Sequence, residues 1–233
     1  MQHIGDERNS IRKEGEIEQG SRVNEIMTTE RSAGISSRTG PATRARILDA
    51  ATALFYANGL RAVSADRIVA QVGITKVTFY RHFPTKEDLI VAYLERRAEW
   101  ERAAVQSARD AAPGNPAKAL RMIVDGIGQE SCSPGFRGCP FINAAAEYAD
   151  GDHAIRHVVA AHRAWFKGAI EEFLVELGVP DSSRVADQLV ILRDGAMISG
   201  YLGDPAMVAD ALYSAGLAVI EHRSSPGQED PPR

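Results

Sequence analysis

The segment from Ser64 to Phe83 carries side chains that could contact the edges of nucleic-acid bases. Lys76 and Thr78 can donate hydrogen bonds to base acceptors, and Val77 between them could contact a thymine methyl group. All three follow Thr75, a good helix cap, which predicts that they share the first turn of a helix. Such a helix start is the part of a helix-turn-helix that enters the major groove, so the chemistry indicated here is recognition of double-stranded DNA.

Cys132 and Cys139 are the two thiols of the chain, separated by six residues and flanked by Gly/Pro loops. They are too few for a disulfide scaffold, and a reducing compartment would keep them as thiols. Arg137 is the only adjacent cation that could lower a thiol pKa. A redox switch based on these two residues is therefore one alternative function.

Other reactive residues give weaker signals. His153, His157 and His162 are four and five residues apart, which with the cysteines makes no recognised metal-ligand pattern. Glu147 and His162 could meet in space, but there is no phosphate-binding glycine loop, no nucleophile elbow and no convincing carboxylate pair. We expect no metal, no cofactor and no enzymatic activity; an enzyme with a helical catalytic domain is the less favoured alternative.

Two short helices are predicted to position the residues from Thr75 onward. Ser64 can cap the first, and Gly73 after it is free to take the positive φ of a turn. Thr75 can cap the second, Lys76 to Phe83, which stops because the residue before Pro84 is pushed out of helical geometry. Ile68, Val69, Phe79 and Phe83 are expected to fill the small core of this helix pair.

Helical periodicity extends over the rest of the chain, with no convincing alternating strand. A helix starts at Pro41 and stops at Asn58-Gly59, and Thr85 with Asp88 resembles a capping box that opens a long helix. Further candidates are Pro116 to Glu130, Phe141 to Tyr148, His153 to Leu177, Ser183 to Leu202 and Pro205 to His222. The predicted fold class is all-α, with an N-terminal three-helix DNA-binding domain followed by a larger helical domain.

Composition and charge divide the chain further. Residues 1–40 and 224–233 have the polar composition of disordered tails, which leaves domains at 41–88 and 89–223. The net charge of −4 conceals a basic segment: residues 41–86 hold seven Lys/Arg against two Asp/Glu, whereas residues 87–233 hold fourteen against twenty-two. A locally basic face suffices for binding to phosphates.

The chain has neither an apolar run that could span a bilayer nor the apolar centre of a secretory signal. We therefore expect a cytoplasmic protein without a membrane partner.

Residues 44–97 closely resemble the N-terminal domain of the TetR family of transcriptional regulators. The resemblance rests on Ile47-Leu48-Asp49-Ala50-Ala51 with Phe55 and Gly59, on Ile68-Val69-Ala70, and on the unbroken run from Val72 to Leu89. Val77 stands where such proteins often have glycine, and Phe79 where leucine is common. The resemblance implies that Tyr80, His82 and Lys86 bind phosphates, with Thr43 and Arg44 as backbone clamps. The full set expected at DNA is Thr43, Arg44, Ser64, Thr75, Lys76, Val77, Thr78, Tyr80, Arg81, His82 and Lys86, and Arg46 is a weaker candidate.

The last two long helices are amphipathic and rich in small residues, which suits a four-helix interface across a homodimer. The resemblance implies the same location. The residues expected there are Leu189, Leu192, Ala196, Val208, Leu212, Ala215 and Val219. The alternative is that these helices only complete the core of a monomer.

Apolar and aromatic residues of the second domain, with a few polar anchors, have the composition of a small-molecule site. The stretch from Phe136 to Tyr148 resembles one that lines the central domain in a subset of TetR-like proteins. The expected ligand residues are Phe141, Asn143, Glu147, Tyr148, His162, Trp165, Phe166, Met197 and Tyr201. The same residues could equally be ordinary core.

These observations together predict a DNA-binding transcriptional regulator. The favoured form is a homodimeric repressor that binds double-stranded operator DNA and is released from it by an unidentified small-molecule effector. The alternative is a redox-responsive regulator that uses Cys132 and Cys139.

Overall fold

The computed structural model describes residues 40–224, and over that range every regular element is a helix, in agreement with the predicted all-α class. The chain divides into two units after Thr43. The described part of the first unit, residues 40–43, is the first turn of α2 (Gly40–Asn58). The predicted tails lie outside the described residues, except Gly40 and Ser224, which belong to helices.

The predicted helix pair is α3 (Ala65–Val72) followed by α4 (Lys76–His82). The Ser64 hydroxyl accepts a hydrogen bond from the Arg67 amide, and the Thr75 hydroxyl accepts one from the Thr78 amide. Gly73 takes the left-handed conformation at φ +70°, which allows the sharp turn between the helices. These details confirm both predicted caps and the predicted turn.

The long helix predicted after Pro84 is α5 (Lys86–Ala111), and it begins with the complete Thr85/Asp88 capping box. Ile47, Ile68, Phe79 and Phe83 are almost fully buried, whereas Val69 is only half-buried. One hydrophobic cluster joins these side chains to α5, α7 (Pro140–Glu147) and the start of α8 (Ala154–Glu176). One continuous cluster of buried side chains therefore joins the α2–α4 helices to the larger helical body.

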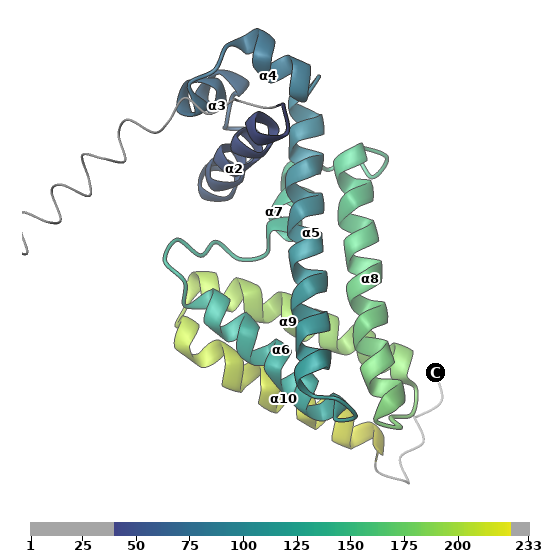
Figure 1. Cartoon of the computed structure of the whole chain (residues 1–233). Helices are drawn as coiled ribbons and strands as arrows, with labels where there is room; N and C mark the ends of the chain where they lie inside the picture. The colour runs from purple at the N-terminus through teal and green to yellow at the C-terminus, as the bar shows by residue number, and fades with distance from the viewer. Residues whose placement is uncertain (1–39, 225–233) are drawn as a thin grey trace, which may run out of the picture. The chain divides into compact units, whose positions relative to one another are not determined.

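The rest of the body consists of α6 (Pro116–Ser131), α9 (Ser182–Leu202), the 3-10 helix η1 (Pro205–Met207) and α10 (Val208–Ser224). Long helix α5 packs against α6 and α8, while α9 packs against α8 and α10, and α10 against α6. Figure 1 shows α6, α9 and α10 gathered beside the half of α5 that is remote from α4. The predicted helix bounds agree with the structure to within one or two residues, apart from the break between η1 and α10.

None of the helices in residues 40–224 combines the length and the hydropathy that a transmembrane span requires.

Candidate DNA-binding surface and internal cavity

The start of α4 presents its side chains to solvent because the opposite side of the helix is anchored by buried Phe79. Val77 is 78% exposed and Tyr80 is 47% exposed. The Thr75 and Thr78 hydroxyls are 3.0 Å apart and hydrogen bonded to each other. The predicted base-contacting residues thus form one exposed patch on the first turn of α4.

Lys76 in this patch is paired with a carboxylate of the preceding helix. Its Nζ lies 2.8 Å from Asp66 Oδ1 and 2.9 Å from Oδ2, and both side chains are largely exposed. The hydrogen bond to Asp66 raises the pKa of Lys76. Lys76 must therefore release Asp66 before it can donate hydrogen bonds to a nucleic acid.

Several of the other residues expected at DNA have a structural partner within the protein. Lys86 Nζ donates to the Arg61 carbonyl at 3.1 Å, and burial lowers the pKa of Lys86. The Arg44 guanidinium lies 4.6 Å from the centre of the Phe83 ring. Arg81 is exposed, and Nε2 of His82 is buried without a partner among the described residues. Ser64 caps α3, Thr43 lies in the first turn of α2, and Arg46 donates to the Val72 carbonyl at 2.6 Å.

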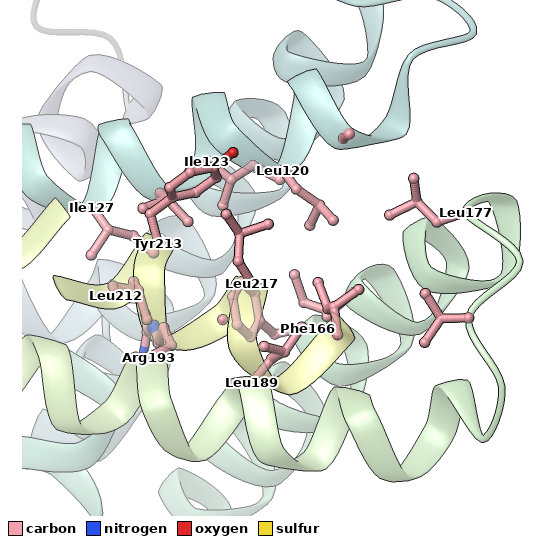
Figure 2. Close-up of a pocket in the computed structure, with 16 residues that line it drawn as sticks. Leu120, Ile123, Ile127, Phe166, Leu177, Leu189, Arg193, Leu212, Tyr213 and Leu217 are labelled. Carbon is pink, nitrogen blue, oxygen red and sulfur yellow. The ribbon is translucent and has the colours of Figure 1, made fainter. Parts of the chain in front are cut away.

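A cavity of about 300 Å³, partly open to solvent, lies in the body and is lined by residues of α6, α8, α9, α10 and the α8–α9 turn. Its wall is almost entirely aliphatic and aromatic, and Arg193 and Tyr213 are its polar residues. Figure 2 shows Arg193 at one side of the cavity with Leu212 and Phe166, while Leu177 lies at the opposite side. Such a space suits an apolar small molecule.

Of the residues predicted to contact a ligand, Phe166 lines this cavity. His162 lies outside the lining, where its ring stacks on Phe141 with centroids 3.6 Å apart. Met197 is fully buried in the cluster that reaches the α2–α4 helices, and Trp165 packs against Arg102. Tyr201 is exposed beside Arg137. The structure therefore does not bring the predicted ligand residues together around one cavity.

Asn143, Glu147 and Tyr148 belong instead to a junction with the α2–α4 helices. The Glu147 carboxylate accepts hydrogen bonds from the backbone amides of Leu60 and Arg61, at 2.8 and 2.7 Å. Tyr148 lies under the Arg61 guanidinium, and Asn143 donates to the Arg137 carbonyl. These contacts tie the residues after α2 to α7.

The loop before α7 adds to this junction through Tyr56 of α2. The Tyr56 hydroxyl donates to the Gly138 carbonyl at 3.0 Å and accepts from the Arg137 amide at 2.8 Å. The Arg137 side chain donates to the carbonyls of Tyr56 and Ala57. A movement of this loop or of α7 would therefore reach the end of α2 directly.

A buried polar cluster lies beside the cavity. Glu101 Oε2 accepts from His162 Nε2 at 2.9 Å and lies 3.5 Å from Arg193 Nη2, while Arg193 Nη1 donates to Cys139 Sγ at 3.1 Å. Burial alone would raise the pKa of Glu101, but the hydrogen bond from His162 and the charges of Arg193 and Arg97 outweigh it and lower the pKa. The side-chain nitrogens His162 Nδ1 and Arg193 Nε have no hydrogen-bond partner among the described residues.

Sequence reasoning missed Glu101 and Arg193. Arg193 stands four residues before buried Met197 and three after buried Val190, on the inner face of α9. A charged residue inside an apolar helical stripe is the signal that could have revealed it, because charges are rarely buried without a partner.

The two cysteines differ in environment. Cys132 is exposed and Cys139 is buried, and both are free thiols. Among residues 40–224 no group of histidine, cysteine or acidic residues has the arrangement of a metal site.

The α9–α10 face carries a second, open apolar groove. Of the residues expected at a dimer interface, Leu192, Ala196, Val208, Leu212 and Ala215 line it. Leu189 faces the internal cavity instead, and Val219 packs against the buried residues of α8 and α9. Ile191, Ile198, Leu202 and Met207, which the sequence reasoning did not include, also line the groove and are exposed.

An all-helical body that follows a helix-turn-helix with an exposed second helix defines a class of DNA-binding regulator. Residues 47–93 match the profile described as bacterial regulatory proteins, tetR family. SCO4454, a TetR-family transcriptional regulator from Streptomyces coelicolor with a known crystal structure, is similar to this chain. The two sequences are 42% identical, and the match covers 78% of this chain and 96% of the SCO4454 chain with a TM-score of 0.75. The chain belongs to the TetR family of transcriptional regulators, a family of regulators and not of enzymes.

Two curated relatives support the same assignment. The HTH-type transcriptional regulator LmrA from Bacillus subtilis is 29% identical over 161 residues, which cover 67% of this chain and 82% of LmrA. The HTH-type transcriptional repressor KstR from Rhodococcus jostii is 35% identical over 94 residues, which cover 40% of this chain and 42% of KstR.

Proposed function

We propose that this chain is a repressor: two copies bind operator DNA through α3 and α4, and a small molecule that enters the internal cavity releases them. The observation that carries the proposal is the pairing of an exposed, donor-rich helix start with a ligand-sized cavity in the same molecule. KstR, one of the relatives, is named as a transcriptional repressor.

The first turn of α4 supports the DNA-binding step. Val77 is too exposed to contribute to the core, but it is well placed for a thymine methyl group between the donors Lys76 and Thr78. The surrounding segment, residues 41–86, is the basic part of an acidic chain. Phosphates attracted to this segment would hold α4 against the duplex.

The groove on α9 and α10 supports assembly into a homodimer. It exposes Ile191, Ile198 and Leu202, and an exposed apolar face of this kind usually marks an interface. A two-fold dimer would present two copies of α4 to half-sites about one helical turn, roughly 34 Å, apart.

The α7 junction supports the coupling between cavity and DNA. Helix α8 supplies cavity residues such as Phe166 and packs against α7, whose Glu147 holds the amides after α2. A ligand that fits the cavity better when these helices have moved would favour a spacing of the two α4 helices that does not fit the operator.

A matched pair of substitutions tests the DNA-binding step. Val77→Asp and Val175→Asp introduce the same carboxylate at two exposed valines, one on α4 and one near the end of α8. Fluorescence anisotropy with fragments selected from the genomic DNA of the source organism should give at least a tenfold lower affinity for Val77→Asp, because a contact is lost and phosphates are repelled. Val175→Asp should bind like the wild type, and equal affinity of both variants would contradict the proposed surface.

A second measurement tests the release step. Compounds that raise the melting temperature of the protein alone are added to the preformed DNA complex. The proposal requires that some of them lower the anisotropy, and it fails if ligands that occupy the cavity leave DNA affinity unchanged.

A further inference from the structure

The Nε of Arg193 is a hydrogen-bond donor that residues 40–224 leave unused. The residue is 7% exposed, and Nε has no partner among residues 40–224. The other guanidinium nitrogens are engaged: Nη1 donates to Cys139 Sγ at 3.1 Å and to Asp194 Oδ1 at 3.3 Å, and Nη2 lies 3.5 Å from Glu101 Oε2. A buried donor without an acceptor is unfavourable, so it points to a partner that is supplied from outside the chain.

The residue that carries this donor lies at the wall of the apolar cavity, although Nε itself is covered. Arg193 contributes to the lining together with side chains such as Leu189, Leu212 and Phe166. Figure 2 shows the Arg193 nitrogens among these carbon side chains, whereas the oxygen of Tyr213 lies apart from them, beside Ile123. The lining on the side of Leu177 and Val179 is apolar. A molecule that fills this space would therefore have one polar end and an apolar remainder.

The charges around Arg193 determine what the polar end should be. Glu101 and Asp194 already place two carboxylates close to the guanidinium. Arg97 pairs with Glu101 and Glu130, and Arg163 pairs with Asp194 at 2.7 Å, so the three arginines face three carboxylates. An added carboxylate would find no uncompensated positive charge and would have to be desolvated, whereas a neutral oxygen needs only the single free N–H.

We propose that the cavity binds a neutral, mainly apolar molecule whose single carbonyl oxygen accepts a hydrogen bond from Arg193 Nε. The apolar remainder lies between α6, α8 and α10, toward Leu177 and Val179. That this molecule is the effector rests on the proposed function, but its binding to the cavity does not.

Three probes with nearly the same skeleton test the chemistry of the polar end. They are butylbenzene, which has no acceptor; 4-phenylbutan-2-one, in which one methylene is a carbonyl; and 3-phenylpropanoate, in which the end is a carboxylate. Isothermal titration of the full chain without DNA should give binding of the ketone and weaker binding of the carboxylate by at least tenfold. Tighter binding of the carboxylate, or no binding of the ketone, would overturn the inference.

Arg193→Lys tests the donor itself. A lysine side chain has a methylene where arginine has Nε, and it keeps a positive charge for Glu101 and Asp194. The variant should bind 4-phenylbutan-2-one about tenfold more weakly and butylbenzene within about threefold of the wild type. The butylbenzene affinity reports that the cavity is intact, so an equal loss for both probes, or no loss for the ketone, contradicts a role for Nε.

Gly216→Leu tests the location without changing Arg193. Gly216 lines the cavity, and a Cβ there would meet Leu189 Cδ2 at an ordinary 3.5 Å, so a larger side chain can extend into the space. The variant should lose at least tenfold in affinity for both neutral probes. Gly126→Leu is the matched control, because Gly126 is exposed on α6 with no atoms near its added Cβ. Ketone binding that survives Gly216→Leu would place the site elsewhere.

The same ketone added to the DNA complex separates the two proposals. Binding through Arg193 without any change in DNA affinity would contradict ligand release while leaving this inference intact. Release of DNA by molecules that bind equally well to Arg193→Lys would support the proposed function and contradict the inference.

Discussion

Opposing effects act on the pKa of Glu101, and those that favour the ionised carboxylate together outweigh the burial of the side chain. Its carboxylate is taken out of water, yet the hydrogen bond from His162 and the nearby arginines keep its pKa below the ordinary value of 4.5. A carboxyl whose pKa is lower in the folded chain than in the unfolded chain stabilises the fold above the unfolded pKa. That stabilisation disappears as the pH falls through the lower, folded value.

Glu101→Gln is therefore expected to make the free energy of unfolding depend less on pH under acidic conditions. At pH 7 the free energy of unfolding should fall by about 3 kcal/mol, because buried Arg193 and half-buried Arg97 lose their shared carboxylate. Below pH 4.5 the wild type should lose stability with falling pH more steeply than the variant. Urea denaturation at fixed protein concentration measures both. Glu99→Gln, at an exposed position of the same helix, should keep the wild-type pH dependence; a variant at Glu101 that does the same would contradict the assignment.

Residues with a local role were predictable, and residues with a distant partner were not. Thr75 and Ser64 cap helices within three residues of themselves, so the local pattern contains the whole interaction. Arg193 meets Cys139 and Glu101, which are 54 and 92 residues away, and no local pattern contains such a pairing. For the same reason the lining of the cavity could not be read from the chain.

At the scale of helices, the periodicity of apolar residues located nearly every element. The predicted helix from His153 to Leu177 is α8, with His153 as its N-cap. What periodicity could not give is which neighbour each apolar face meets. Leu189 and Leu192 both lie on the apolar side of α9, yet one faces the internal cavity and the other the open groove.

Glu147→Gln is expected to loosen the link between α7 and the residues after α2. The amide keeps one oxygen acceptor but presents an NH₂ group to the second backbone N–H, so one of two charge-assisted hydrogen bonds is lost. Hydrogen exchange followed by NMR should show the amides of Leu60 and Arg61 exchanging about tenfold faster, equivalent to about 1.4 kcal/mol. The Gly59 amide, bonded to the Phe55 carbonyl, is the internal reference. Unchanged exchange at both amides would mean that Glu147 does not hold this junction.

At the scale of the whole molecule, a basic segment, residues 41–86, is joined to an acidic body, residues 87–233. The body also exposes apolar side chains along the α9–α10 groove. Their removal from water would drive the proposed assembly of two copies. The sequence pattern predicts a dimer interface on these two helices, but it does not separate the residues that turn outward from those that close the cavity.

Ile198→Asp is expected to convert the dimer into monomers. Ile198 is 46% exposed within the groove, and a two-fold interface would bury two introduced carboxylates at once. Sedimentation velocity should give a dimer dissociation constant raised by at least about 100-fold, or about 2.7 kcal/mol. Operator affinity should fall in parallel. Val175→Asp, outside the groove, should remain dimeric; a dimeric Ile198→Asp would mean that another face joins the copies.

Lys76 brings its own counter-charge, in the form of Asp66, ten residues earlier. A cation that a protein carboxylate already balances gains less from displacing the ions condensed on an arbitrary stretch of duplex. We therefore expect short residence times at non-operator sequences. Lys76 should leave Asp66 only where a base edge offers a better acceptor. A chromosome offers many competing sites, so the competition between Asp66 and DNA for Lys76 would shorten the search for the operator.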